Sequence, residues 1–330
     1  MFSLEELLNI CEQKKSLTMF DSFIKTNLKL SLKKKPVCSI SGGWDSDIVL
    51  DIVTKLDPDK KVTYIFFDTG IEYEATKRHL DFLEEKYEIQ ILRLRAIVPV
   101  PLGCKRFGVP FWSKHVSEMI CRLQKHDFQW EDLPYENLLE KYPKCKSALK
   151  WWCNLHGEKS KFNISYVFGL KEYMIAFPPK FKISSKCCKG GKKDNAKKFL
   201  MENGADLNIV GIRKNEGGVR SGAYKSCFDP AKDKEGWDNY RPVFWYTDDD
   251  KIQYDETFNV QHSDCYCKYG LDRTGCAGCP FGKDFERELA ICKEHEPKLY
   301  KAINNIFFDS YEYTRNFLKF REGLKSGETH

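Results

Sequence analysis

The first hundred residues alternate between short apolar runs and longer stretches in which apolar residues recur every three or four positions. The short runs are Pro36–Ile40, Val62–Phe67 and Ile89–Leu94, each of strand length. Between them lie Asp45–Leu56 and Tyr73–Tyr87, which have the period of amphipathic helices. Strands that alternate with helices predict an α/β fold with an open, mostly parallel sheet and flanking helices.

The remainder of the chain has a less regular pattern. Residues 97–112 contain three prolines and two glycines, so we expect a loop there. A further strand is predicted at Leu207–Ile212, and residues 241–260 are predicted to hold a short strand and then a helix. The last 50 residues are predicted to be mainly helical. The Trp151–Trp152 pair is expected in the core rather than stacked on bases.

Composition indicates a soluble globular protein. The 330 residues are 42% hydrophobic and 31% charged, and no run approaches the roughly 18 apolar residues that a membrane span needs. The N-terminal string "MFSLEELLNICEQKK" lacks the hydrophobic region of a signal peptide. We therefore expect a cytoplasmic protein without a membrane partner.

The net charge is +6, and much of the basic excess lies in "KLSLKKKP" and "KCCKGGKKDNAKK". Such runs form either a solvated face or a rim that attracts phosphates or nucleic acid. Composition alone leaves both interpretations open.

The string "SGGWDS" between the first strand and the first helix predicts an anion site, because backbone N–H groups at a helix N-terminus attract negative charge. Ser41 and Ser46 add hydroxyl donors, and Gly42 and Gly43 let phosphate oxygens approach the backbone. Asp45 is expected to cap the helix or to hold a magnesium ion beside the phosphates.

This string is not the P-loop, because the spacing is shorter and the P-loop lysine is missing. It resembles the SGGxDS pyrophosphate loop of the PP-loop superfamily, which includes ATP pyrophosphatases and sulfonucleotide reductases. The resemblance implies an adenine nucleotide α-hydrolase-like fold that binds ATP or a sulfonucleotide.

Two later strings also resemble the phosphoadenosine phosphosulfate (PAPS) reductase-like family. "VTYIFFDTGIEYEAT" resembles its second strand, and implies that Asp68, Thr69 and Gly70 lie at the carboxyl edge of the sheet, where ligands bind. "VGIRKNEGGVR" resembles its GxRxxE…R segment. There Arg213 and Arg220 would bind phosphate or sulfate oxygens.

The resemblance covers residues 36–285 and so predicts the domain organisation. Residues 1–35 form an N-terminal helical extension, residues 36–285 the PP-loop domain, and residues 286–330 a helical C-terminal tail.

Fourteen cysteines are many for a reducing compartment, so the clustered ones are candidate metal ligands or redox thiols. A tandem Cys187–Cys188 and a later Cys276-x-x-Cys279 resemble the cluster signature of adenylyl-sulfate reductases. That resemblance implies a 4Fe–4S cluster held by these four thiolates, in or beside the helical C-terminal region.

A compact set of Cys265, Cys267, Cys276 and Cys279 is the alternative, and it would suit zinc. Unligated thiols are the third possibility.

The resemblance implies a nucleotide-dependent transferase, acting in adenylation and sulfur transfer, or a sulfonucleotide oxidoreductase. Asp45, Arg213 and Arg220 would be the catalytic residues. The family's reductases use a cysteine in a C-terminal string like ECGxH, and no cysteine follows Cys292 in this sequence. The reductase reaction is therefore the less supported of the two.

The alternative function is a non-catalytic nucleotide-sensing or nucleic-acid-binding protein on the same fold. The positive charge and the missing nucleophile favour it. The expected partners are an adenine nucleotide, a sulfur donor or redox protein, and nucleic acid.

Overall fold

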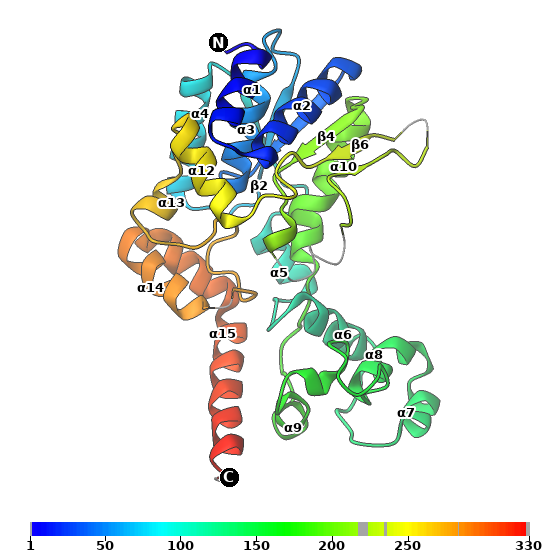
Figure 1. Cartoon of the computed structure of the whole chain (residues 1–330). Coiled ribbons are helices and arrows are strands. Elements are labelled where there is room, and N and C mark those ends of the chain that lie inside the picture. Colours follow the sequence, from blue (N-terminus) through cyan, green and yellow to red (C-terminus); the bar gives the residue numbers. More distant parts are fainter. Residues whose placement is uncertain (1, 217–223, 234–235, 283, 328–330) are drawn as a thin grey trace. The chain divides into compact units, whose positions relative to one another are not determined.

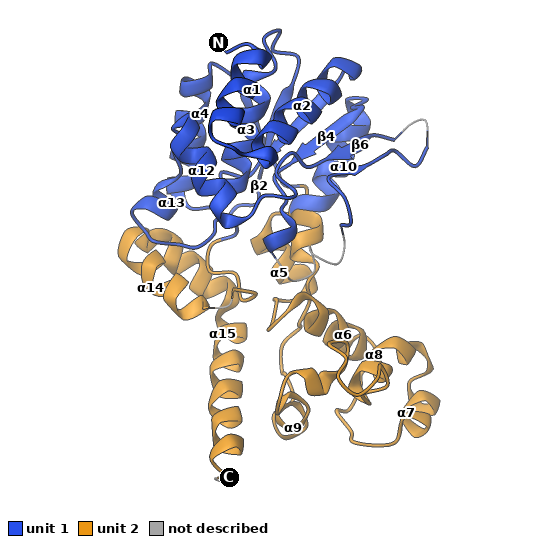
Figure 2. Cartoon of the chain, in the orientation of Figure 1, with its two compact units in different colours: residues 1–96, 192–276 blue, residues 97–191, 277–330 orange. Residues whose placement is uncertain are grey.

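The computed structural model of the chain describes residues 2–216, 224–233, 236–282 and 284–327 (Figure 1). The chain folds into two compact units, coloured separately in Figure 2. Unit 1 comprises residues 1–96 and 192–276, and unit 2 comprises residues 97–191 and 277–330. The first segment of unit 2 is thus inserted between the two segments of unit 1. The predicted domain limits describe the extent of a family resemblance and stay predictions.

Unit 1 contains a six-stranded sheet in the order β3-β2-β1-β4-β6-β5. Only the β5–β6 pair is antiparallel among the described strands. The strands are β1 (Pro36–Ile40), β2 (Thr63–Asp68), β3 (Ile91–Arg95), β4 (Leu207–Val210), β5 (Phe228–Asp229) and β6 (Asp238–Tyr240). The predicted α/β class with a mostly parallel sheet is confirmed.

The helices of unit 1 flank this sheet (Figure 1). They are α1 (Leu4–Gln13), α2 (Leu17–Leu32), α3 (Trp44–Lys55), α4 (Glu74–Tyr87), α10 (Asp194–Glu202), α12 (Asp248–Phe258) and α13 (Asp264–Cys267). Helix α3 is buried through Ile48, Val49 and Ile52, as its apolar pattern predicts. Helices α1 and α2 place Leu7 and Phe23 in the same core, so the N-terminal helices are part of unit 1.

The register of the sheet brings three sequence motifs to one edge. Strand β1 pairs in parallel with β2 on one side and with β4 on the other. Because parallel strands end at the same edge, the segments that follow Ile40, Asp68 and Val210 all begin there. These segments are the SGGWDS loop, the turn after β2, and the start of the GxRxxE string.

Unit 2 is helical in its described part. Its helices are α5 (Val100–Phe107), α6 (Lys114–Gln124), α7 (Tyr135–Lys141), α8 (Lys146–Trp152), α9 (Leu170–Ala176), α14 (Phe285–His295) and α15 (Pro297–Ser326), with short 3₁₀ turns at Pro143–Cys145 and Ile164–Tyr166. Its core contains Trp151 and Trp152, as expected, and Tyr313 and Phe317 of α15 pack against it. The C-terminal region is helical, as predicted.

Two local predictions are wrong. Residues 97–112 include helix α5, because Pro99 and Pro101 lie at its N-terminal cap and first turn, where a missing N–H costs no helical hydrogen bond. The short strand expected after residue 241 lies earlier, at β6, and the chain turns at Arg241–Tyr246. None of the helices in the described ranges is long and apolar enough to cross a membrane.

Candidate functional site

The SGGWDS string forms the tight turn between β1 and α3 that the sequence predicts. Gly42 has φ of +66°, and a Cβ there would lie 2.7 Å from Thr76 Cγ2. Both the backbone conformation and this close approach require glycine. Gly43 is the N-cap of α3, so the first N–H groups of the helix face the carboxyl edge of the sheet.

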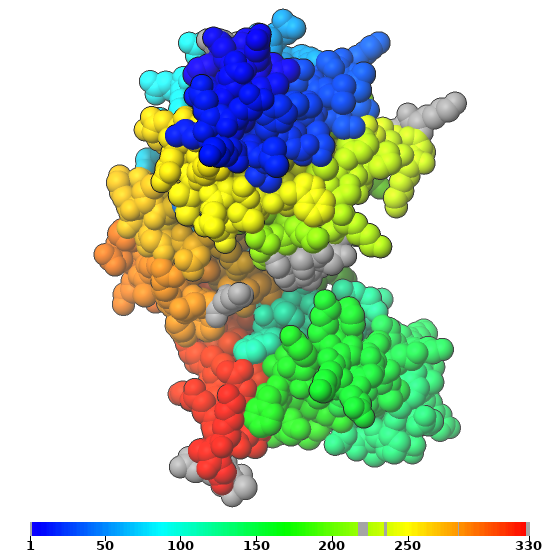
Figure 3. Space-filling view, in the orientation of Figure 1, coloured from blue at the N-terminus to red at the C-terminus, as the bar shows by residue number. Residues whose placement is uncertain are grey.

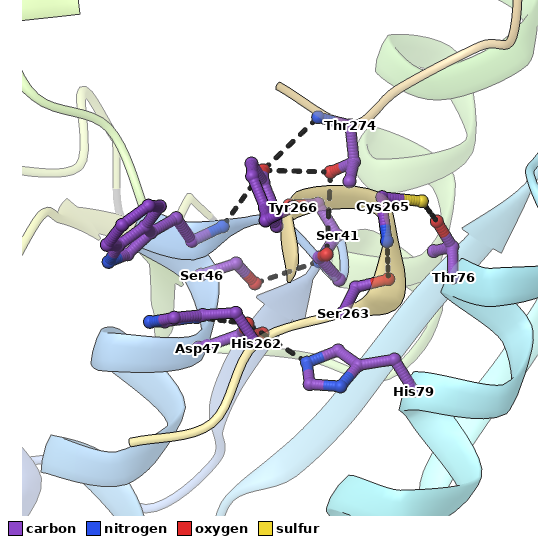
Figure 4. A network of polar contacts seen from close by, with 12 residues as sticks. Ser41, Ser46, Asp47, Thr76, His79, His262, Ser263, Cys265, Tyr266 and Thr274 are labelled. Carbon is purple, nitrogen blue, oxygen red and sulfur yellow. Dashed lines mark hydrogen bonds and ion pairs between the residues drawn. The ribbon is translucent and has the colours of Figure 1, made fainter. Parts of the chain in front are cut away.

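Several polar groups of the loop already have partners within unit 1 (Figure 4). Ser46 Oγ accepts the N–H of Ser41 at 2.9 Å. Tyr266 Oη accepts the N–H of Trp44 at 3.1 Å and the N–H of Thr274 at 3.2 Å. The Tyr266 hydroxyl thus engages one of the N–H groups at the start of α3 that the sequence predicts to bind an anion. Tyr266 was missed by sequence reasoning because it lies more than 200 residues from the loop.

We expect Tyr266→Phe to increase the affinity of the loop for pyrophosphate by about 5-fold, because it releases the N–H of Trp44 from one hydrogen bond worth about 1 kcal/mol. Calorimetric titration with magnesium pyrophosphate checks this, with Tyr300→Phe in α15 of unit 2 as the matched control. Unchanged or weaker binding would show that the Tyr266 hydroxyl does not compete with the anion.

Asp45 is paired with two cations at the start of α3. Its Oδ1 lies 2.9 Å from Arg213 Nε and 3.3 Å from Lys251 Nζ. Arg213 is only 6% exposed and also pairs with Asp248 at 2.9 Å. Burial lowers the pKa of Arg213, but the two carboxylates outweigh it and raise that pKa. The predicted catalytic pair is thus in contact, with each side chain neutralising the other.

Lys251 is a third charged residue at the start of α3, beside Asp45 and Arg213, and the sequence did not indicate it. Its Nζ lies 4.4 Å from the centre of the Trp44 ring. The sequence around Lys251 gives no sign of this contact. Lys251 follows three aspartates at the start of α12 and has the pattern of an ordinary exposed helix surface. Arg220, the other predicted catalytic residue, lies outside the described residues.

The turn after β2 is organised by Glu72, the acid that follows the DTG string (Asp68, Thr69 and Gly70). Its carboxylate accepts the N–H of Thr69 at 3.0 Å, the hydroxyl of Thr69 at 2.5 Å and the N–H of Gly70 at 3.1 Å. Asp68 Oδ1 also accepts the N–H of Gly70, at 2.8 Å. Glu72 is buried, and burial raises its pKa. The predicted ligand-binding residues of this turn are therefore held by one another and by Glu72.

Two cysteine thiols of unit 1 lie against the same edge of the sheet. Cys276 Sγ is 3.5 Å from Thr69 Oγ1 and, because that hydroxyl donates to Glu72, the thiol is the donor. Cys265 Sγ is 3.6 Å from the hydroxyl of Thr76, the residue that packs on Gly42 (Figure 4). The two thiols thus contact Thr69 of the turn after β2 and Thr76, which approaches Gly42 of the SGGWDS loop, within one unit.

The other predicted ligands lie in unit 2, where Cys187 is buried. A hydrogen bond with Cys104 is the main cause of the raised pKa of the Cys187 thiol, with Cys188 opposing it and Cys279 adding charge repulsion. Helix α5 packs closely here, since a Cβ on Gly103 would lie 3.3 Å from Cys187 Cα. Cys104 was missed because it stands alone in the sequence, with no partner at a ligand spacing.

A preformed metal site is absent from the described ranges. No group of three His, Cys, Asp or Glu side chains there is arranged to hold a metal ion. Cys187, Cys188 and Cys279 belong to unit 2, whereas Cys276 is the last residue of unit 1. Thiolates suit an iron–sulfur cluster or zinc chemically, and both predicted ligand sets stay predictions.

A histidine–carboxylate network lies next to the first turn of α3, directly after the SGGWDS loop (Figure 4). His262 lies 2.9 Å from Asp47 Oδ2 and 3.0 Å from Asp255 Oδ2. Asp47 also contacts His79 at 2.9 Å, and Trp44 donates its indole N–H to Asp255 at 2.6 Å. These contacts tie α12 and the segment after it to the first turn of α3. Asp47 was not indicated by the sequence, because it lies just after the SGGxDS string.

We expect stability to fall as pH rises through the titration of His262. Burial lowers its pKa, but hydrogen bonds to Asp255 and Asp47 outweigh this and raise it from 6.5 to about 9. The protonated form is therefore favoured in the folded state. Its contribution is complete below about pH 6.5 and is lost as pH passes about 9.

Urea unfolding of the wild type and of His262→Gln at several pH values between 6 and 10 measures this contribution. The difference in unfolding free energy between wild type and variant should shrink across that interval, whereas Gln129→Ala on unit 2, which removes no titratable group, should show no such trend. A constant difference would mean that folding does not raise the pKa of His262.

Comparison with known proteins gives one family match. Residues 35–139 match the family model described as the phosphoadenosine phosphosulfate reductase domain. The matched region begins before β1 and includes the SGGWDS loop and the turn after β2. It confirms the resemblance that these two strings predict.

Two curated relatives match over shorter stretches. An uncharacterized protein of Methanocaldococcus jannaschii is 33% identical over 102 residues, which are 31% of this chain and 21% of the relative. An adenosine 5'-phosphosulfate reductase of a Geobacillus species is 24% identical over 90 residues, which are 27% of this chain and 37% of the relative. The chain thus spans well under half of either relative.

Two solved structures show weak likeness. One is a phosphoadenylyl-sulfate reductase of Candida auris in a phosphate complex, with a TM-score of 0.43 and 12% identity, covering 84% of this chain and 96% of that chain. The other is the U34-tRNA thiolase NcsA of Methanococcus maripaludis with its 4Fe-4S cluster, with a TM-score of 0.36 and 12% identity, covering 90% of this chain and 80% of that chain.

Proposed function

We propose a function for this chain as a member of the PAPS reductase-like family of the PP-loop superfamily. It is an enzyme that binds ATP or a sulfonucleotide at the loop from Ser41 to Ser46 and uses it for sulfur transfer or sulfonucleotide chemistry. The observation that carries the proposal is the placement of two thiols, Cys265 and Cys276, beside an anion loop in one unit. A cytoplasmic location is part of the proposal.

In the adenylation reaction, a nucleophilic oxygen of the acceptor attacks the α-phosphorus of ATP. A new phosphorus–oxygen bond forms, the α–β bridging bond breaks, and pyrophosphate leaves with that electron pair. The N–H groups at the start of α3 would hold the leaving pyrophosphate. Arg213, with Arg220, would stabilise the charge that develops on the phosphoryl oxygens. The thiol of Cys265 is the candidate to carry the transferred sulfur, because Cys276 is assigned to the cluster.

Magnesium, bound with the nucleotide, would neutralise the phosphates and polarise them toward attack. Asp45 and Asp248 are the carboxylates beside the loop that would hold it. Asp45 is already paired with Arg213 and Lys251. We propose that these cations turn to the phosphates when Asp45 turns to the metal.

Incubation with magnesium and ATP, with or without candidate sulfur acceptors, tests the reaction. Release of AMP and pyrophosphate supports adenylation. A separate incubation with adenylyl sulfate and a dithiol reductant tests the reductase reaction, and formation of sulfite and AMP with two-electron oxidation of the dithiol supports it. Tight nucleotide binding without either turnover would favour the alternative, a non-catalytic nucleotide-sensing or nucleic-acid-binding protein.

The proposed cofactor is a 4Fe–4S cluster held by Cys187, Cys188, Cys276 and Cys279. We expect protein purified without oxygen to contain about four irons and four sulfides per chain, with a matching absorption band in the visible range. Cys187→Ser should lose both, whereas Cys121→Ser in α6 should keep them. One zinc and no sulfide would make the cysteines structural and would place the chemistry on the nucleotide loop.

A further inference from the structure

We propose that residues 154–182 of unit 2 form a binding surface for single-stranded nucleic acid. Four aromatic side chains within sixteen residues of this segment are about half exposed or more. They are Phe162 (48%), Tyr166 (67%), Phe168 (54%) and Phe177 (55%). Solvent-facing surface of this part of the chain is coloured green in Figure 3.

This exposure is not explained by a lack of core space. The same segment buries Leu170, Tyr173 and Met174 on α9, and unit 2 has a large aromatic core around Trp151 and Trp152. Exposed aromatic rings that lie close together in the sequence, beside a well-filled core, are typical of a binding surface.

The charge of the surrounding chain selects the kind of partner. From Lys144 to Gly191 the sequence holds ten lysines and two acidic residues. Within the segment, Lys159, Lys161, Lys180 and Lys182 are exposed. Protein–protein interfaces are depleted in lysine, whereas nucleic-acid surfaces combine lysines for phosphates with aromatic rings for bases. The combination therefore favours a nucleic acid over a protein partner.

The aromatic and basic groups are interleaved on a fixed backbone. Lys161 Nζ lies 5.6 Å from the centre of the Phe162 ring. The buried side chain of Asn163 accepts the N–H of His156 at 3.0 Å and donates to the carbonyl of Gly157 at 2.6 Å. The N–H of Tyr166 then donates to the carbonyl of Asn163. The loop before α9 is thus closed by its own hydrogen bonds, so stacking on it costs little ordering entropy.

The far end of the segment is held by α15. Phe177 packs on Phe320 with ring centres 6.1 Å apart, and Tyr313 donates its hydroxyl to the Phe177 carbonyl at 2.8 Å. Lys171 lies between the two ends but pairs with Asp132 at 2.5 Å, so it is not counted among the phosphate-binding lysines. Both ends of the surface belong to unit 2 alone.

The test is fluorescence anisotropy of the full chain with labelled 20-nucleotide single strands of RNA and of DNA, and with the DNA duplex. Binding should be tighter for single strands than for the duplex and should weaken linearly with salt on logarithmic axes. The RNA and DNA arms identify which strand the surface prefers. The measurement uses no ATP, so it can succeed or fail independently of the proposed nucleotide reaction.

The triple variant F162A/Y166A/F168A should weaken binding at least about 10-fold and leave the salt slope nearly unchanged, because it removes base stacking but no charge. K159Q/K161Q/K180Q should instead reduce the salt slope. The matched controls on α15, Phe308→Ala and K298Q/K301Q, should behave as the wild type. Binding that is absent, or that the triple aromatic variant leaves unchanged in a chain with wild-type circular dichroism, would overturn the proposal.

Discussion

Asp45→Asn should reduce ATP turnover by about 100- to 1,000-fold, the range for losing one preorganised hydrogen-bond donor of an active site, because Asp45 orients two such donors, Arg213 and Lys251. The substitution keeps the size of the side chain but removes the negative charge that pairs with Arg213 and Lys251. Arg213 retains Asp248 and the carbonyl of Tyr246 as partners, so the fold should persist. Steady-state release of pyrophosphate and a thermal melt measure the two effects separately.

The matched control is Asp249→Asn, which removes an exposed carboxylate from the first turn of α12, beside Asp248. It should leave turnover within about 2-fold of the wild type. Retained turnover in Asp45→Asn would refute the assignment of Asp45 to the reaction. Lost turnover together with a lower melting temperature would instead show that Asp45 acts by holding the fold.

Gly211→Ala should abolish tight nucleotide binding and lower the unfolding free energy by about 1–3 kcal/mol, the range for overpacking a close contact. A Cβ at this position would lie 2.9 Å from the N of Ser46 and 3.0 Å from the carbonyl carbon and oxygen of Asp45. These are backbone atoms of the loop, so they cannot rotate away as a side chain would. The first turn of α3 must shift, and its N–H groups shift with it.

Gly275→Ala is the control, because a Cβ there meets nothing within 4 Å. Isothermal titration with ATP and urea unfolding of both variants give the two quantities. If Gly211→Ala binds ATP as tightly as the wild type, the close packing of Gly211 against Asp45 and Ser46 is not needed for nucleotide binding.

The sequence predicted the parts of the fold that depend on local pattern. The apolar runs and helical periods of residues 36–95 define β1, α3, β2, α4 and β3, and a parallel sheet follows from their alternation. The turn at Gly42 was predictable for the same reason, because its glycines, its serines and the start of α3 are adjacent in the chain.

The groups that surround the loop were not predictable in this way. Lys251, Tyr266 and Thr274 reach the loop from more than 200 residues away, and nothing in their own neighbourhoods indicates an anion site. Helix α5 was missed because prolines were treated as helix breakers without regard to position. Proline in the first turn removes an N–H that has no helical partner, so the helix forms.

The insertion of residues 97–191 also determines the order in which unit 1 is completed during synthesis. Strands β1, β2 and β3 leave the ribosome first, but β4, which pairs with β1 from Pro36↔Leu207 onward, is made roughly 110 residues later. At about 5–20 residues per second, one edge of the central strand stays unpaired for roughly 5 to 20 s. An apolar strand with an open edge is prone to pair with other chains. Heterologous production should therefore depend on chaperones and on temperature more strongly than the size of unit 1 alone suggests.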